Sequence, residues 1–285
     1  MKKGLFTKWL PKFNIDIILK LIKEGRNIKE ISKIIGIPNR RLGEMLKFYN
    51  ININKQYSIH KNHDYFDIID TEEKAYILGY TIADGCVSIE PKKRNNVIYS
   101  SSKRLSYIVS IDDREIIEKI RTEISPTTKI KEFHNTKGAV NRKLQISLRI
   151  SSNKIVDDLI KLNVIPNKTY NSNFKFNFNN IEHTLIRHLI RGFMDGDGHV
   201  AKSDLSFVST SKIFLEQIVE FFKNEIPDIK YRFYKNNGKT IDYYKLYINL
   251  GFEKRKQIYN LLYENSTIFL KRKKLKFNIE NTVLI

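Results

Sequence analysis

Two segments of this chain share one pattern, and no other feature constrains the fold as strongly. Residues 77–85 read ILGYTIADG and residues 190–198 read IRGFMDGDG. Each segment is an apolar run that predicts a buried helix, with a glycine near its start and an Asp-Gly pair at its end. The last turn of a helix carries partial negative charge and disfavours an aspartate there. Two aspartates in matching places of this kind, Asp84 and Asp197, indicate that a cation binds where the two helices end.

The small residues of the two segments predict that these helices pack against each other. Gly79 and Gly192 fall at matching points, and Ala83 and Gly196 follow one turn later. Residues with little or no side chain let two helix axes approach to about 8 Å. We therefore expect Gly79 and Gly192 to form the contact between the two helices.

The glycines that follow the aspartates suit the end of a helix. We expect Gly85 and Gly198 to take the left-handed conformation that commonly ends helices, which brings Asp84 and Asp197 together. Two carboxylates in one place repel each other unless a cation lies between them. Mg²⁺ binds one or two carboxylates together with waters and phosphate, and such ions promote phosphodiester hydrolysis.

The segments after the two motifs repeat one order of elements, which predicts an internal duplication about a pseudo-two-fold axis. After the first motif we expect strands at 97–110, 128–134 and 144–150 and helices at 112–124 and 153–162. After the second we expect strands at 205–209, 230–234 and 244–250 and helices at 211–224 and 253–263.

The two halves can be aligned by sequence after their motifs. Residues 113–120 align with 211–218, and residues 143–146 align with 245–248. The first half is longer, and its surplus lies around 91–103, a basic, serine-rich stretch that indicates a loop.

Residues 15–50 predict a separate helical unit. Apolar spacing indicates helices at 15–22, 28–35 and 39–49, with a tight turn at 36–38. A short helix, a turn with glycine and a basic helix form the helix-turn-helix pattern of DNA-binding domains. Asn39, Arg40 and Arg41 then begin the recognition helix. The alternative is a three-helix cap that only packs on the rest of the chain.

The charge of the chain points to a polyanionic partner. Lysine and arginine number 51 against 31 aspartates and glutamates, so the formal net charge is +20. Nucleic acid relieves the self-repulsion of such a chain. A membrane surface is the alternative, but no basic amphipathic anchor and no run long enough to span a bilayer supports it. Cys86 is the single cysteine, which excludes an internal disulfide and predicts a reducing, cytoplasmic location; an organellar one stays open.

The paired motifs, the repeat and the charge together resemble the LAGLIDADG homing endonuclease family in its single-chain, two-motif form. The resemblance covers residues 71–285. It implies an α+β fold, a duplicated αββαββα unit whose two four-stranded antiparallel sheets form a saddle over DNA. We expect a helix-turn-helix domain at 1–52, a linker at 53–70, and the two halves at 71–178 and 179–285.

The resemblance also assigns roles to residues of the motifs. The last acid of each motif is the family's metal ligand, which implies Asp84 and Asp197 with two or more divalent ions, Mg²⁺ foremost. The first copy has Ile82 where the motif has an earlier acid, whereas the second keeps Asp195. That earlier position is usually structural, so its loss does not count against catalysis.

Basic residues near the metals are a further implication of the family. Lys143 and Lys245 head the last strand of each half and are our candidates for stabilising phosphate charge or holding the attacking water. The alternative for both is a lysine that contacts phosphate or simply lies on the surface. Alternating polar residues on the strands, and a basic cluster after the last helix, give the remaining DNA-contact candidates: Gln145, Arg149, Lys230, Arg232, Lys271 and Arg272.

The sequence thus predicts a monomeric, site-specific double-strand DNA endonuclease. Three alternatives stay open. They are a non-catalytic DNA-binding regulator on the same scaffold, a maturase that binds intron RNA, and an α+β nucleic-acid-binding protein whose Asp-Gly pairs only end helices.

Overall fold

The computed structural model describes residues 15–277 apart from 24–25, 27, 50, 52–60, 95, 135–143, 202 and 239. The chain divides into two compact units, residues 1–62 with 125–127, and residues 63–124 with 128–285. No helix within the described ranges is long and apolar enough to cross a membrane.

The N-terminal unit contains the three helices that the sequence predicts. They are α1 (Ile15–Lys23), α2 (Ile28–Ile35) and α3 (Asn39–Phe48). Their apolar faces meet in a small core of their own, formed by Ile18, Ile22, Ile31, Ile37, Leu42 and Leu46. Between α2 and α3 the chain turns at Gly36, whose φ of 69° favours glycine.

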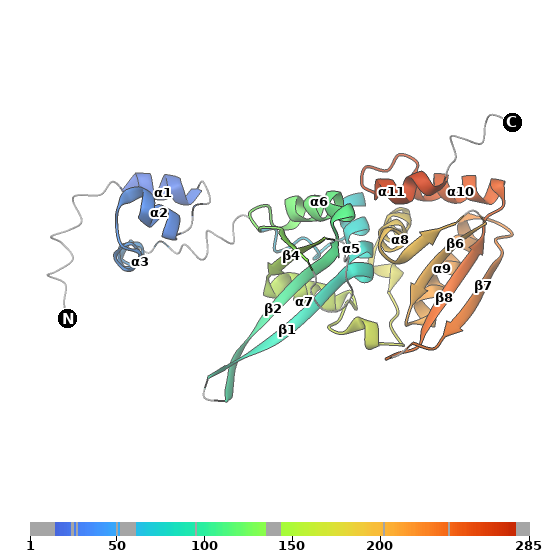
Figure 1. Ribbon diagram of the computed structural model, residues 1–285, viewed down its shortest axis with the longest axis horizontal. Helices are drawn as coiled ribbons and strands as arrows, with labels where there is room; N and C mark the ends of the chain where they lie inside the picture. The colour runs from blue at the N-terminus through green and yellow to red at the C-terminus, as the bar shows by residue number, and fades with distance from the viewer. Residues whose placement is uncertain are drawn as a thin grey trace. The chain divides into compact units, whose positions relative to one another are not determined.

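The larger unit has the duplicated helix-and-sheet architecture that the motifs imply. Helices α5 (Glu72–Asp84) and α8 (His183–Asp197) lie side by side at its centre, with a four-stranded antiparallel sheet on either side (Figure 1). The first half continues with β1 (Gly85–Arg94), β2 (Val97–Ser110), α6 (Arg114–Ile124), β3 (Lys131–Phe133), β4 (Gln145–Ser151) and α7 (Asn153–Lys161). The second continues with β5 (Gly198–Val200), β6 (Asp204–Ser209), α9 (Lys212–Glu225), β7 (Tyr231–Asn236), β8 (Tyr243–Asn249), α10 (Phe252–Tyr263) and α11 (Lys271–Lys274).

The two sheets have equivalent strand orders, β1-β2-β4-β3 and β5-β6-β8-β7. Their registers correct one alignment of the sequence. Gly85 and Gly198 pair with Tyr107 and Phe207, which pair in turn with Leu148 and Leu246.

This pairing makes Lys245, which lies one residue before Leu246, the counterpart of Ser147. The predicted equivalence of Lys143 and Lys245 is therefore wrong. The connections before these strands differ in length, so matching lysine letters did not reflect matching positions.

The surplus of the first half is a strand pair rather than the loop expected at 91–103. β1 pairs with β2 along the whole length of β1, with one irregularity at Lys92/Lys93, and the hairpin projects from the body of this unit (Figure 1). Its counterpart in the second half is short, because β5 spans only Gly198–Val200. Serine and lysine side chains are compatible with a two-sided, solvated ribbon, so composition alone did not distinguish it from a loop.

The last part of the expected linker belongs to the core of the larger unit. Tyr65 and Phe66 are each 1% exposed, and Ile69 is also buried. His63 makes a 2.7 Å hydrogen bond through Nδ1 with Ser152 Oγ. The linker at 53–70 is therefore wrong for residues 63–70. Residues 53–60 lie outside the described part of the chain.

Gly79 and Gly192 confirm the predicted contact between the motif helices. A Cβ atom on Gly79 would lie 1.9 Å from the carbonyl oxygen of Leu189, and one on Gly192 would lie 2.0 Å from that of Tyr76. Both distances are far shorter than any van der Waals contact. The backbones of α5 and α8 therefore touch at these points, as a close helix pair requires.

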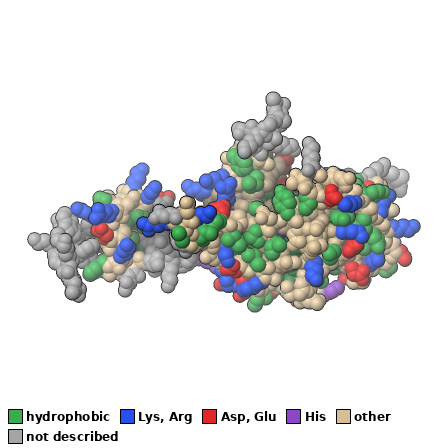
Figure 2. Space-filling view, turned by 90° about the horizontal axis from the view of Figure 1, so that it is seen from below, with side chains coloured by type: hydrophobic (Ala, Val, Ile, Leu, Met, Phe, Trp, Pro, Cys, Tyr) green, Lys and Arg blue, Asp and Glu red, His purple; other side chains and the backbone are tan. Residues whose placement is uncertain are grey.

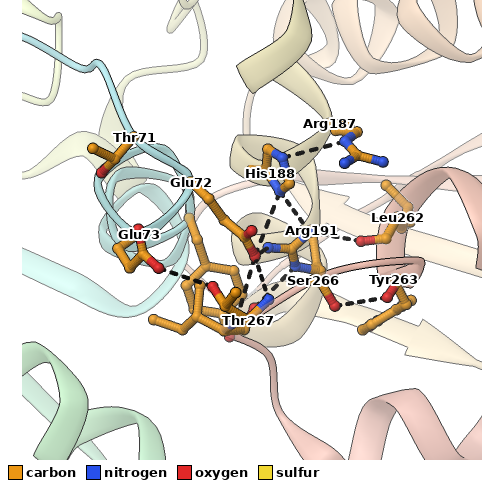
Figure 3. Close-up of polar contacts among 12 residues, drawn as sticks. Thr71, Glu72, Glu73, Arg187, His188, Arg191, Leu262, Tyr263, Ser266 and Thr267 are labelled. Atoms are coloured by element: carbon orange, nitrogen blue, oxygen red, sulfur yellow. Dashed lines mark hydrogen bonds and ion pairs between the residues drawn. The ribbon is translucent and has the colours of Figure 1, made fainter.

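A buried polar network joins the start of α5 to the middle of α8 (Figure 3). Arg191 is fully buried and donates to Glu72 Oε1 at 2.6 Å, to the Leu262 carbonyl at 2.7 Å and to His188 Nδ1 at 2.7 Å. The Thr267 amide donates to the same Glu72 oxygen at 2.8 Å. A buried guanidinium is tolerated only with partners of this kind.

The network predicts an acid sensitivity centred on His188. Burial and then the neighbouring Arg191 lower the pKa of His188 to about 4, with Glu72 opposing them. The pKa of a histidine in the unfolded chain is near 6.5. A histidine whose pKa is lower than this in the folded state favours folding at pH values above about 6.5. That contribution is lost as the pH falls from about 6.5 to about 4. We expect acidification over this range to cost about 2 kcal/mol through His188.

Urea unfolding at pH 7 and pH 4.5 measures this contribution. The pH dependence of His188→Gln should be flatter than that of wild type, because glutamine carries no proton-binding site. His183→Gln removes an exposed histidine from the same helix and should leave the wild-type dependence unchanged. Equal pH dependence in wild type and His188→Gln would contradict the assignment.

Candidate functional site

Asp84 and Asp197 are the last residues of α5 and α8, and the helix pair brings them together as predicted. A Cβ atom on Gly196 would lie 2.3 Å from the Ala83 Cβ and 3.1 Å from an Asp84 carboxylate oxygen. The small residues at 83 and 196 thus allow the helix ends to meet, with both carboxylates at the negative ends of their helices.

The environment of both carboxylates disfavours negative charge. Burial raises the pKa of Asp84, and the nearby Asp113 raises it further. Asp197 faces solvent on one side, yet its enclosure by protein on the others and the neighbouring Asp84 raise its pKa to about 7. Desolvation and like charge both act in this direction. A bound cation would therefore stabilise the ionised forms of both carboxylates.

Gly85 and Gly198 end the two helices in a way that differs from the predicted one. Their φ values are −73° and −91°, so neither is left-handed. Glycine is needed at both positions because a side chain would not fit there, and not because of the backbone conformation. A Cβ atom would lie 2.6 Å from the Thr81 carbonyl oxygen at Gly85 and 2.5 Å from the Met194 carbonyl oxygen at Gly198. Each chain can then pass directly from the helix into the first strand of its sheet.

Lys168 reaches the end of α5 from the segment that follows α7. Its Nζ donates to the Ala83 carbonyl at 3.1 Å. Burial lowers the pKa of Lys168, while Asp197 and Asp84 act against that shift. The ammonium group therefore lies beside both carboxylates.

Lys273 reaches the end of α8 from the segment that follows α10. It is 5% exposed, and its Nζ donates to the Gly198 carbonyl and, at 3.5 Å, to the Met194 carbonyl. Its charge lowers the pKa of Asp84 and of Asp197. Each helix end thus carries one aspartate and one lysine, and the partial negative charge of a helix C-terminus favours the lysine.

The predicted basic residues lie elsewhere. Lys245 lies in β8, opposite Val208 and Tyr234, and Lys143 is outside the described residues. Sequence reasoning missed Lys168 and Lys273 because both follow the last helix of their half in segments without periodicity. A signal was present: in each half, the lysine comes three residues after an apolar residue, Ile165 or Leu270.

Asp195, the earlier acid of the second motif, lies in the core. It is fully buried and accepts hydrogen bonds from the Tyr76 hydroxyl at 2.7 Å, the Tyr263 hydroxyl at 2.8 Å and the Leu270 amide at 2.7 Å. Its first-half counterpart Ile82 is buried among apolar side chains. These contacts agree with a structural part for that position.

A pocket of about 340 Å³ opens beside Asp197, towards the second sheet. Its polar lining includes Lys168, Asp197 and Tyr243, and its apolar lining includes Phe193 and Phe214. The helix ends are therefore accessible to a ligand from this side.

The donor set suits a hard divalent cation. Two carboxylates converge, and both have raised pKa values that a cation would lower. Among the described residues, no group of three or more His, Cys, Asp or Glu side chains could hold a metal. Two carboxylates completed by water and phosphate are the ligand set typical of Mg²⁺, and they exclude a site of the cysteine-and-histidine type.

The outward face of the second sheet is polar, basic and aromatic. Register places Lys245 in one row with Val208 and Tyr234, while Arg232 shares a row with Ser206 and Tyr247. The Arg232 guanidinium lies 5.5 Å from the Tyr247 ring centroid, a cation–π arrangement. Lys230 begins the next row, since its carbonyl accepts from the Asn249 amide at 2.9 Å.

The first sheet presents a comparable row on its outward face. Gln145 pairs with Ser110, and Arg149 pairs with Ser106, whereas Ile146 and Leu148 point into the core. The four described strand candidates, Gln145, Arg149, Arg232 and Lys245, thus share the faces that point away from the core, and Lys230 lies where β7 begins.

The basic cluster after α10 differs from the exposed group that was expected. Lys271 is exposed, but Arg272 donates to Asp113 at 2.5 and 2.8 Å, and Lys273 is buried. In the N-terminal unit, Asn39, Arg40 and Arg41 are exposed at the start of α3, and Arg40 forms a 3.2 Å ion pair with Glu44.

The surface charge is dispersed. Figure 2 shows one face of the molecule on which lysine and arginine side chains alternate with acidic ones. The excess of basic residues thus forms no single block on this face.

Comparison with known proteins identifies the second half. Residues 184–261 match the family model described as a LAGLIDADG-like domain. The matched range contains the second motif with Asp197, both strands of the β7–β8 pair and most of α10. The first half has the same strand order and an equivalent central helix, which agrees with the predicted duplication.

The chain is also similar to solved structures of two homing endonucleases. I-DmoI in complex with DNA and Ca is 16% identical, with 67% of this chain and 88% of that chain covered and a TM-score of 0.46. A lysine-to-alanine mutant of I-SmaMI is 11% identical, with 73% and 92% covered and a TM-score of 0.47. No curated protein matches the chain.

Proposed function

We propose that this protein is a monomeric, site-specific double-strand DNA endonuclease that depends on a divalent cation. The observation that carries the proposal is the pair of helix ends, each with one aspartate and one lysine. Two such sets match a reaction performed twice, once on each DNA strand. A binding protein has no need of two convergent carboxylates, whose negative charge opposes the approach of a phosphate.

Asp84 and Asp197 would hold Mg²⁺, which when bound supplies a polarised phosphate and an activated water. The protein contributes the geometry of the site. Contact between the helix backbones fixes the separation of the carboxylates. Lys168 and Lys273 place positive charge where it can stabilise the charge that develops on the phosphate. Burial lowers the pKa of both ammonium groups, which makes each a better proton donor than an exposed lysine.

The outward faces of the two sheets would bind the DNA. Lys245, Arg232 and Arg149 can contact phosphates or base edges, and tyrosines between them offer flat apolar contacts. The exposed start of α3, with Arg40 and Arg41, would bind a further part of the target. Both halves lie on one chain, so the enzyme acts as a monomer.

Selection of cleaved sequences tests this function. A library that contains the DNA flanking the gene, together with randomised duplexes, is incubated with the full chain and Mg²⁺, and linear products are sequenced. We expect one preferred site, cut on both strands only in the presence of the cation. Tight binding without cleavage would instead support a regulator, and preference for structured intron RNA would support a maturase.

The two lysines predict strand-specific effects. Lys168→Met and Lys273→Met each remove positive charge from one helix end and should slow cleavage of one strand by about 100-fold. The other strand should be cut at close to the wild-type rate, so nicked DNA accumulates. Substrates labelled on either strand measure this effect. Slowing of the same strand by both variants would contradict the assignment of one lysine to each site.

A further inference from the structure

We propose that the ion pair between Arg272 and Asp113 is a positioning device that holds Lys273 at the end of α8. Neither residue belongs to α5 or α8, although Asp113 lies close enough to Asp84 to raise the pKa of that carboxyl. The inference rests on the proposed function only for its effect on cleavage. The position of Lys273 itself can be tested without it.

The segment after α10 crosses from one half of the larger unit to the other. It belongs to the second half by sequence, yet Thr267 donates through Oγ1 to Glu73 at 2.8 Å, and its carbonyl accepts from Lys119 at 3.3 Å. Glu73 and Lys119 lie in α5 and α6 of the first half. In Figure 1 the segment runs along one edge of the unit beside α10. This segment, residues 264–277, therefore connects the two halves, and we call it the strap.

Four consecutive residues of the strap bind the two halves. The Leu270 amide donates to Asp195 at 2.7 Å, in the second half, and the Lys271 amide donates to Glu115 at 3.0 Å, in the first. Arg272 then binds Asp113 in the first half, and Lys273 binds the Gly198 and Met194 carbonyls in the second. Neighbouring side chains of the short helix α11 thus point to opposite halves.

The Arg272–Asp113 pair is built to fix an orientation. The guanidinium donates from Nε at 2.5 Å and from Nη2 at 2.8 Å to the two carboxylate oxygens. A two-point contact of this kind restricts rotation as well as distance. Asp113 is 6% exposed and precedes α6, and the adjacent turn is closed by the Ser110 hydroxyl, which accepts from the Asp112 amide at 3.3 Å. The carboxylate is therefore a rigid anchor.

α11 spans only Lys271–Lys274, too short to hold its own orientation. Rotation of this turn would move Lys273 away from the Gly198 carbonyl. The ion pair one residue earlier opposes that rotation. Lys168 has no equivalent support, because its neighbours Asn167 and Thr169 carry no charge. The Arg272–Asp113 ion pair therefore positions the lysine at only one of the two helix ends, that of α8.

Reactivity of the lysine amine tests the position of Lys273 directly. The folded, full-length chain is treated briefly with acetic anhydride, and modification of each lysine is measured by mass spectrometry. We expect Lys273 to be protected in wild type and to react severalfold faster in Arg272→Gln and Asp113→Asn. Exposed Lys235 provides an internal reference. Unchanged protection of Lys273 in both variants would overturn the proposal, whether or not the protein cleaves DNA.

Strand-resolved cleavage tests the consequence for activity. Arg272→Gln should slow by about 10- to 100-fold the strand that Lys273→Met slows, and leave the other strand unaffected. Asp113→Asn should slow the same strand to a similar extent, while its loss of charge also acts on the nearby Asp84. Arg272→Lys keeps the charge but loses the two-point contact, and should fall between wild type and Arg272→Gln. Equal slowing of both strands would indicate a general loss of structure and would also overturn the proposal.

Arg114→Gln is the matched control. Arg114 follows Asp113 and binds Glu132 at 2.7 Å, so its loss removes another guanidinium–carboxylate pair from the same place in the first half. It contacts no residue of the strap in the described part of the chain. We expect wild-type protection of Lys273 and wild-type cleavage of both strands. If wild type cuts no DNA, the proposed function fails, and the amine reactivity still decides the positioning.

Discussion

Replacement of both Asp84 and Asp197 by asparagine will abolish DNA cleavage, with a loss of about 1000-fold or more on each strand. Asparagine keeps the size of each side chain, so the contact between α5 and α8 is preserved. It removes the negative charge that would hold the cation. Cleavage of the selected target in Mg²⁺, followed on both strands, measures the loss. DNA binding should persist, because the outward sheet residues are unchanged.

The same double variant should be more stable than wild type in the absence of divalent ions. The pKa of Asp197 is raised to about 7. The pKa of an aspartate in the unfolded chain is near 4. A carboxyl group whose pKa is higher than this in the folded state stabilises the fold at pH values below about 4, and that stability is lost as the pH rises towards 7. Wild type therefore bears an electrostatic cost at pH 8 that asparagine removes. We expect a higher melting temperature for the variant at pH 8 and a smaller difference at pH 5.

Asp228→Asn provides the control for these measurements. Asp228 is exposed and has a φ of 58°, which asparagine tolerates well. This variant should cleave and unfold like wild type. Full cleavage by the double variant would refute the metal site, whereas loss of both cleavage and binding would mean that the substitution damaged the DNA-binding surface instead.

The central contact could be predicted from sequence because its cause is local. Gly79, Gly192, Ala83 and Gly196 are small at one helical spacing, and that spacing fixes which residues face the partner helix. Strand and helix order followed from apolar periodicity in the same way. The rows of outward side chains on the sheets needed the register, which no residue pattern supplied.

The two lysines could not be predicted because tertiary contacts place them. Lys168 and Lys273 lie in irregular segments whose paths depend on what they pack against. The sequence favours Lys143 and Lys245 instead, because each lies at the start of a predicted strand in a matching stretch of sequence. Asp113 illustrates the same limit. Its sequence counterpart is Ser211, an ordinary helix cap that accepts from the Phe214 amide. Asp113 differs from Ser211 because Arg272 of the strap binds its carboxylate, and the sequence around Asp113 does not indicate that contact.

Replacement of Gly79 or Gly192 by alanine will separate the two halves. The added Cβ would lie 1.9 Å from the Leu189 carbonyl oxygen or 2.0 Å from that of Tyr76. Both neighbours are backbone atoms, which cannot rotate away as a side chain can. The helices must therefore move apart along their whole contact, and the packed sheets must follow them. We expect each variant to lose about 3 kcal/mol or more of stability.

Calorimetry of the full chain measures this loss as a fall of about 6–12 °C in the melting temperature of the larger unit. Gly251→Ala is the control in the same unit, because nothing lies within 4 Å of its Cβ position, and it should melt close to wild type. A shift of less than a few degrees in both Gly79→Ala and Gly192→Ala would refute the close contact. Cleavage should fall more steeply than stability. The same displacement parts Asp84 from Asp197, and a site that needs both carboxylates fails at a separation the fold can still survive.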